Sequence, residues 1–149
     1  ATGYLATHWN SANSQYLVTL KQRVWGYVWA NDPLAASYTP STTYQRNSTG
    51  QLNTINRLGV GYYQVVFENL GIYYGGTLDV TAYGAGSENC KVQNWGPTLA
   101  DMNVYVRCFN ANGAALDTRF TAAFTRPISS SLARRAACSG PAPPNAISV

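Results

Sequence analysis

The sequence contains few charged residues. Asp, Glu, Lys and Arg together make up 11% of its 149 residues, well below the roughly 25% of an ordinary soluble domain. Tyr, Ser, Thr, Asn and Gly fill the remaining polar positions, so we expect a surface rich in hydroxyl and amide groups. Such groups enter a contact at a lower desolvation cost than charges. The composition is typical of an extracellular or assembly-forming protein.

Long apolar runs are also missing. No stretch approaches the ~18 consecutive apolar residues of a membrane helix, so we predict no membrane span. The first ten residues, ATGYLATHWN, lack the basic start and apolar centre of a signal peptide. This start fits either a mature secreted chain or an intracellular protein. The length fits a single domain.

Residues that carry catalytic or metal chemistry are scarce. His8 is the only histidine, it stands beside Trp9, and no G-x-S-x-G motif is present. The acidic residues mostly lie beside turns, where Asp commonly caps local structure, which disfavours a glycosidase pair. There is no C-x-x-C pair, P-loop, Rossmann glycine motif or EF-hand loop. We predict a protein with no catalytic residue, no cofactor and no metal.

The net charge of +4 raises the question of a nucleic-acid partner. The basic residues cluster only at Lys21 to Arg23 and at Arg134-Arg135, and elsewhere they are scattered singly. A nucleic-acid surface needs a basic stripe with interleaved aromatic residues. We therefore predict no nucleic-acid binding.

Alternation with a period of two recurs along the chain, whereas helical periodicity is hard to find. In MNVYVRCF, residues 102–109, Val104, Val106 and Cys108 alternate with polar or larger neighbours, as in a half-buried strand. The same pattern occurs in QYLVTLK, GYVWAN, GYYQVVF, TLDVTAY and TRFTAAF, and CKVQNW adds a further candidate. Gly- and Asn-rich turns separate these segments. The sequence predicts an all-β fold, an antiparallel β-sandwich of immunoglobulin-like or jelly-roll kind with seven to eight strands.

The cysteines favour one disulfide. Cys90 begins one predicted strand and Cys108 nearly ends the next, so a hairpin between them brings the two side chains together. We predict an intradomain disulfide, with a pair of buried free thiols or a chemical site as the alternatives. A disulfide implies an oxidising compartment, which favours a secreted or cell-surface protein. Cys138 is left over, either as an unpaired thiol or as a partner for another chain.

The pattern divides the chain into three parts. Residues 1–25 form an N-terminal extension with an edge strand, residues 26–125 the sandwich, and residues 126–149 a Ser/Ala/Pro-rich C-terminal extension. In the last part we expect a short helical turn in LARRAAC and an extended PAPPNAISV. Because sandwich edges accept added strands, we expect the extensions to dock on a neighbouring subunit, with folding back on their own domain as the alternative.

Aromatic residues are abundant, with four Trp and eleven Tyr. Trp25, Tyr27 and Trp29 share one face of a predicted strand, and we expect Trp25 and Trp29 to be core residues. Exposed aromatic side chains at strand ends and turns would instead suit a sugar-stacking platform. The candidates for that platform are Tyr62, Tyr73, Tyr74 and Trp95. Asn47-Ser48-Thr49 matches the N-glycosylation pattern.

The segments YVWANDPLAASYTPSTTYQRNSTG, GVGYYQVVF, DVTAYG, CKV, VYVRCF and LDTRFTAAF follow one another between Gly26 and Phe124. In this order they resemble a β-sandwich repeat of secreted bacterial proteins that has no assigned activity. The resemblance covers about two thirds of the chain and implies an extracellular, non-catalytic module. It also implies a bridge between Cys90 and Cys108, where that repeat is usually linked.

Together these patterns predict a structural subunit of an extracellular or cell-surface assembly, such as a fibre. The subunit would self-associate through its terminal extensions into a homo-oligomer or polymer. The alternative is a secreted carbohydrate-binding module, lectin-like or an adhesin, with a glycan as its partner.

Overall fold

A computed structural model describes residues 4–10, 15–21, 23–72 and 74–127. All regular structure within these residues is β-strand, which confirms the predicted all-β class. None of the described segments forms a helix long and apolar enough to cross a membrane. The chain divides into two units, one of residues 24–126 and the other of residues 1–23 with 127–149.

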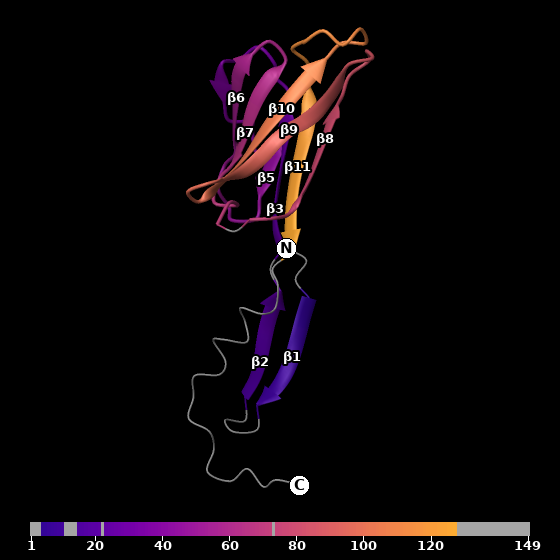
Figure 1. Ribbon diagram of the computed structural model, residues 1–149. Coiled ribbons are helices and arrows are strands. Elements are labelled where there is room, and N and C mark those ends of the chain that lie inside the picture. The colour runs from indigo at the N-terminus through magenta and orange to yellow at the C-terminus, as the bar shows by residue number, and fades with distance from the viewer. Residues whose placement is uncertain (1–3, 11–14, 22, 73, 128–149) are drawn as a thin grey trace. The chain divides into compact units, whose positions relative to one another are not determined.

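The larger unit is a sandwich of two antiparallel sheets (Figure 1). The five-stranded sheet has the order β4-β6-β7-β10-β9, and the four-stranded sheet has the order β5-β3-β11-β8. The strands are β3 (Arg23–Ala30), β4 (Ser37–Tyr38), β5 (Gln45–Asn47), β6 (Thr54–Gly59), β7 (Tyr62–Phe67), β8 (Thr77–Ala82), β9 (Asn89–Thr98), β10 (Asp101–Phe109) and β11 (Phe120–Pro127).

Alternating side chains build the core between the sheets. On β7, Tyr63, Val65 and Phe67 are at most 1% exposed, while the residues between them are half-buried. The alternating residues of β10 and β11 fill the same interior from both sheets, because successive side chains of a strand point to opposite faces. The core is completed by Val28, Ala30, Ile55, Leu70, Met102, Val104, Val106, Cys108, Phe120, Ala122 and Phe124.

The number of strands exceeds the prediction. The described residues contain eleven strands, whereas the sequence pattern indicates seven or eight. The pattern misses β4, β5 and β6, because the first two have only two and three residues and the third has one fully buried side chain, Ile55. These strands extend the sheets at one side, where β4 pairs with β6 and β5 pairs with β3.

The smaller unit contains a β-hairpin. β1 (Tyr4–Asn10) pairs antiparallel with β2 (Gln15–Lys21), from Tyr4 opposite Lys21 to Asn10 opposite Gln15. β2 matches the strand predicted at 15–21, and β1 was not predicted. The helical turn and the extended tail predicted after residue 127, together with Cys138, lie outside the described residues.

Candidate functional site

Cys90 and Cys108 form a disulfide, as predicted. The two residues are direct partners in the register of β9 and β10, and their sulfur atoms are 2.05 Å apart. Cys108 is fully buried and Cys90 packs against the core. The bond therefore fastens the edge strand β9 to the sheet, and the two cysteines are not free thiols. Among the described residues, no group of three His, Cys, Asp or Glu side chains is placed to hold a metal ion.

Asp117 is the most highly connected carboxylate of the sandwich. It lies in the connection between β10 and β11, where its Oδ1 accepts hydrogen bonds from Arg57 Nε at 3.0 Å and from the Gly61 N–H at 2.9 Å. Arg57 Nη2 lies 2.7 Å from Asp117 Oδ2, and the Tyr63 hydroxyl lies 2.9 Å from Oδ1. The carboxylate thereby ties the β10–β11 connection to β6 and β7.

These contacts shift the pKa values of the groups involved. The Arg57 guanidinium, followed by the Gly61 N–H and the Tyr63 hydroxyl, holds the pKa of Asp117 below its ordinary value of 3.8. Burial, then the hydrogen bond and negative charge of Asp117, raise the pKa of Tyr63 well above its usual range. Both oxygens of Asp117 are engaged within the fold, so we assign this cluster to stability rather than to chemistry.

The aromatic residues predicted to form a sugar platform do not share one surface. Tyr62 lies on the solvent face of β7, in register with Arg107 of β10. The Arg107 guanidinium is 3.7 Å from the centre of the Tyr62 ring. Trp95 is in register with the core residue Val104, and so extends from the opposite face of the sheet with 49% of its surface exposed. Tyr74 is 86% exposed in the connection before β8, and Tyr73 lies outside the described residues.

The aromatic residues of β3 face solvent instead. Trp25 and Tyr27 are half-buried and Trp29 is 44% exposed, so the prediction that Trp25 and Trp29 belong to the core is wrong. The alternate positions of β3, which are Gly26, Val28 and Ala30, fill the interior. A Cβ atom added at Gly26 would lie 2.9 Å from side-chain atoms of both Phe67 and Leu70. The interior therefore has room only for small residues opposite those two side chains.

We call Trp25, Tyr27 and Trp29 the β3 stripe. The rings of Trp25 and Tyr27 are almost parallel, with 10° between their planes and 6.4 Å between their centres. Trp29 contacts Tyr44 and Tyr83, with ring centres 5.4 Å and 6.5 Å away. The stripe continues at this end into a cluster of three aromatic rings.

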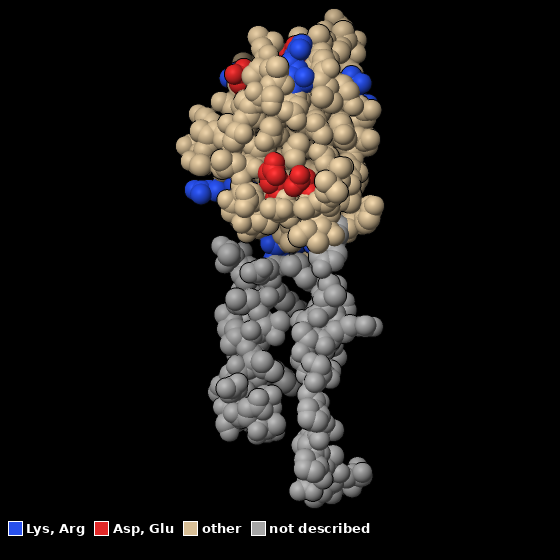
Figure 2. Space-filling view, turned by 90° about the vertical axis from the view of Figure 1, so that its left-hand side faces the viewer, with Lys and Arg blue, Asp and Glu red and all other residues tan. Residues whose placement is uncertain are grey.

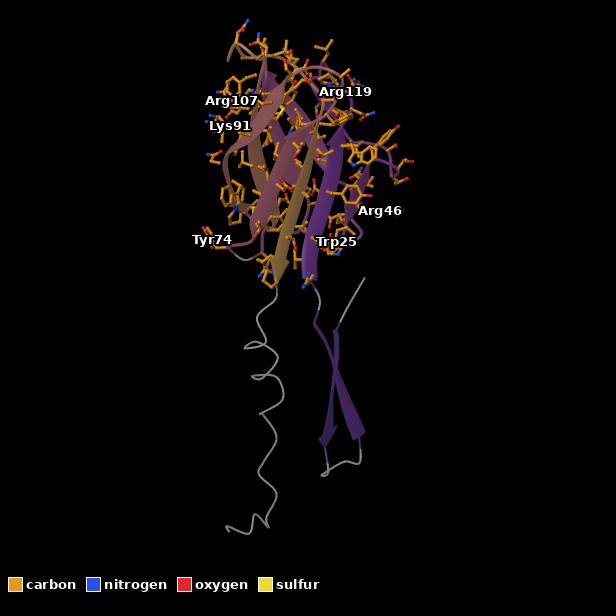
Figure 3. All side chains as sticks on the ribbon, turned by 90° about the vertical axis from the view of Figure 1, so that its right-hand side faces the viewer. Trp25, Arg46, Tyr74, Lys91, Arg107 and Arg119 are labelled. Carbon is orange, nitrogen blue, oxygen red and sulfur yellow. A yellow bond between two sulfur atoms is a disulfide. The ribbon has the colours of Figure 1, made fainter. Side chains whose placement is uncertain are left out.

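Small or polar side chains flank the β3 stripe on both sides. On the neighbouring strand β11 the outward positions are Thr121, Ala123 and Thr125, since the positions between them are buried. On the other side, Tyr27 is in register with the exposed Arg46 of β5, which also lines a small pocket with Thr42 and Gln51. Figure 3 shows Arg46 and Trp25 on the same side of the sandwich. The aromatic rings thus stand beside hydroxyl groups and the guanidinium of Arg46, and the Arg119 guanidinium lies over Tyr83 at the end of the stripe.

Charged side chains are sparse on the face of the sandwich that Figure 2 shows. Figure 2 shows the Lys, Arg, Asp and Glu side chains of one face as a few separate spots on a surface that is otherwise uncharged. A surface of this kind selects ligands by shape, stacking and neutral hydrogen bonds more than by long-range attraction.

The glycosylation motif has a structural use. Asn47 Nδ2 donates hydrogen bonds to Asn53 Oδ1 and to the Glu68 carbonyl oxygen, each at 2.9 Å. Its Oδ1 accepts from the backbone N–H and the hydroxyl of Thr49. The amide of Asn47 is therefore engaged by the fold at every donor position.

The resemblance to a repeat of secreted bacterial proteins stays a prediction. Comparison of the chain with family models, with curated proteins and with solved structures finds no match.

Proposed function

We propose that the protein is a non-catalytic carbohydrate-binding module and that the β3 stripe is its binding surface. The observation that carries this proposal is the outward position of Trp25, Tyr27 and Trp29 on one central strand of the four-stranded sheet. Large aromatic side chains normally fill the interior of a sandwich, where their burial stabilises the fold most. Here Gly, Val and Ala occupy the interior positions of β3 and the rings face solvent.

Sugars fit the chemistry of this surface. A pyranose ring has an apolar C–H face that packs on an aromatic ring, and its rim carries hydroxyl groups that both donate and accept hydrogen bonds. The hydroxyls of Thr121 and Thr125 flank the stripe on one side, and Arg46 supplies donors on the other. The rings lose little conformational entropy on binding, since each has only two rotatable side-chain bonds. A neutral or weakly polar glycan is the ligand class that these groups complement.

The experiment is a comparison of two tryptophans with similar exposure. We expect Trp29→Ala to lower the affinity of the protein for a neutral polysaccharide by about tenfold, because an aromatic contact worth about 1.5 kcal/mol is lost. Trp95→Ala removes a tryptophan of similar exposure from the five-stranded sheet, since 49% of the Trp95 surface is exposed and 44% of the Trp29 surface. This control substitution should leave the affinity for the polysaccharide unchanged. Binding would be measured by affinity electrophoresis across a panel of neutral polysaccharides.

Other outcomes of these measurements would move the glycan-binding surface to different residues or reject it. If Trp95→Ala and Tyr74→Ala abolish binding while Trp29→Ala does not, the platform is the one predicted from the sequence. If the wild-type protein binds no glycan in the panel, the β3 stripe is not a carbohydrate surface. A thermal melt of each variant checks that the sandwich is folded.

We also propose that the protein is secreted or displayed at a cell surface. The Cys90–Cys108 disulfide supports this location, because such bonds persist in oxidising compartments and are rare where thiols are kept reduced. The low charge and the hydroxyl-rich composition point in the same direction.

The β1–β2 hairpin favours a second proposal, that the protein is a self-associating structural subunit. Within the described residues no third strand pairs with this hairpin, and a lone two-stranded hairpin has marginal stability in water. Its outer edges therefore offer backbone donors and acceptors to a strand from another copy. In this proposal the terminal extensions join subunits while the sandwich presents the glycan surface.

Native mass tests this second proposal. We expect residues 1–149 to form oligomers in solution and a fragment of residues 24–127 to stay monomeric, as judged by light scattering after size-exclusion chromatography. Loss of the larger species in a Cys138→Ala variant would assign a role to Cys138. A full-length chain that is monomeric at every concentration would exclude self-association through the extensions.

A further inference from the structure

We propose a second ligand site on the outer face of the five-stranded sheet, formed by Arg107 of β10 and Lys91 of β9. The ligand is an oxyanion group, sulfate or carboxylate, carried by an acidic saccharide. The site lies on the other sheet from the β3 stripe, and Figure 3 shows Arg107 and Lys91 next to each other on the opposite side of the sandwich from Trp25 and Arg46. It is therefore independent of the proposed neutral-glycan surface.

Arg107 is held in a fixed position. Its guanidinium lies 3.7 Å from the centre of the Tyr62 ring, and its Nε donates a hydrogen bond to Gln93 Oε1 at 2.8 Å. The residue is half-buried, so part of its hydration is already lost. Stacking and this one hydrogen bond orient the planar group, and the two terminal nitrogens remain to bind an oxyanion through paired hydrogen bonds.

Lys91 places a second positive charge beside the first. Arg107 and Lys91 are direct partners in the register of β9 and β10, and the Lys91 Nζ lies 5.4 Å from the centre of the Phe109 ring. Like charges directly opposite each other on neighbouring strands are unfavourable. Across the described residues, no Asp or Glu forms an ion pair with either of them. The sheet thus holds two adjacent cations, each against an aromatic ring, whose repulsion an anion would relieve.

The surroundings favour a saccharide as the carrier of the anion. A row of hydroxyl and amide side chains crosses the same face, from Ser37 through Asn56 and Gln64 to Asn103, with successive donor–acceptor distances of 2.7, 3.1 and 2.8 Å. Such groups match the hydroxyls of a sugar. Two cations are enough to bind one oxyanion, whereas strong binding of a nucleic acid rests on basic side chains that neutralise several backbone phosphates.

The test measures binding of the full-length protein to dextran sulfate, polygalacturonate, inorganic sulfate and unsubstituted dextran. We expect the double substitution Lys91→Gln with Arg107→Gln to lower the affinity for at least one acidic polymer by about tenfold or more, since charge-assisted hydrogen bonds are lost. Arg107→Lys keeps the charge and should lose part of the affinity, because lysine cannot make the paired contact. Added salt should weaken wild-type binding more than binding by the double variant.

Arg119→Gln is the matched control. Arg119 also lies over an aromatic ring, 5.5 Å from the centre of Tyr83, but it is next to the four-stranded sheet. Its substitution removes one positive charge and should change acidic-polymer affinity less than about twofold, which the screening of separated surface charges allows. Preference for dextran sulfate over polygalacturonate identifies sulfate as the group, and the reverse identifies carboxylate.

Three results would overturn the site. The double variant could bind acidic polymers as the wild type does, or Arg119→Gln could lose as much affinity as the double variant. Binding of duplex DNA more tightly than either saccharide, with the same dependence on Lys91 and Arg107, would reject a saccharide ligand. Trp29→Ala distinguishes the two surfaces, because it should reduce neutral-glycan binding and leave acidic-polymer binding intact.

Discussion

At the scale of single residues, Asp117 links the β10–β11 connection to the β6–β7 hairpin, which lies 54 to 60 residues earlier in the sequence. It accepts hydrogen bonds from Arg57 on β6 and from the turn that contains Gly61, and it lies within hydrogen-bond distance of Tyr63 on β7. Removing the negative charge leaves Arg57 without its counter-charge and weakens the hold on the β10–β11 connection. Its role is to position a long connection against the sheet.

We expect Asp117→Asn to lower the free energy of unfolding by about 2 kcal/mol, in line with the loss of hydrogen bonds to a charged group. The measurement is urea denaturation at neutral pH. Asp79→Asn, which neutralises an exposed carboxylate of β8, is the control and should change stability by less than about 0.5 kcal/mol. Equal effects of the two substitutions would show that the Asp117 contacts contribute no more than surface charge.

The difference between wild type and Asp117→Asn should also depend on pH. The folded protein lowers the pKa of Asp117 below 3.8, so its contribution is complete above that pH and disappears as pH falls through the folded-state value. Burial and the nearby Asp101 raise the pKa of Glu68, so acidification relieves an unfavourable charge there. That effect is common to both proteins and cancels in the difference. A difference in the free energy of unfolding between the two proteins that stays constant down to about pH 2 would contradict this account.

Residue patterns locate the faces of a strand but not always which face is inside. β10 is clear in the sequence, since its interior positions are apolar and most of the alternate positions, which include the buried Asn103, are polar. In β3 both faces are apolar, with aromatic residues on one and Gly26, Val28 and Ala30 on the other. Phe67 and Leu70, which are distant from β3 in the sequence, fill the space beside Gly26. Only the face of β3 with small residues can therefore pack against the interior. The β3 stripe was therefore not predictable as an exposed surface from its own strand.

At the scale of strands, the disulfide secures an edge. β9 has β10 as its sole hydrogen-bonded neighbour in the five-stranded sheet of the described structure. The paired positions of Cys90 and Cys108 were predictable, because alternation placed both on the interior face of neighbouring strands. The strands β4 and β5 were not predictable, because segments of two or three residues carry no measurable period.

We expect the double substitution Cys90→Ala with Cys108→Ala to lower the free energy of unfolding by roughly 3 kcal/mol, as the chain-entropy model gives for a loop of this length. Denaturation by guanidinium chloride would measure the loss. Cys138→Ala is the control for thiol removal and should leave the transition of the sandwich unchanged. If the double variant had the same free energy of unfolding as the wild type, the hydrogen-bonded pairing of β9 with β10 would hold the edge strand in place without the disulfide.

At the scale of the whole molecule, residues 24–126 contain their own core. Among the residues whose burial the structure describes, every member of the buried cluster lies between Val28 and Phe124. This unit therefore meets the physical requirement for independent folding, since it holds a buried apolar cluster of its own.

We expect a fragment of residues 24–127 to unfold in one cooperative transition, with a midpoint within a few degrees of the sandwich transition in the full chain. Differential scanning calorimetry of both proteins would measure this. A fragment that fails to fold, or melts far below the full chain, would mean that the sandwich depends on residues of the extensions.

The path of the chain through the four-stranded sheet has a mechanical consequence. β3 begins at Arg23 and β11 ends at Pro127, and the two strands are neighbours that run in opposite directions (Figure 1). The chain thus enters and leaves the sandwich at the same end, on adjacent strands. Tension applied between residues 23 and 127 would load the hydrogen bonds between these strands in the unzipping geometry, so that they break one after another. The same strands would resist more strongly if they were pulled in shear, when all their bonds carry the load together.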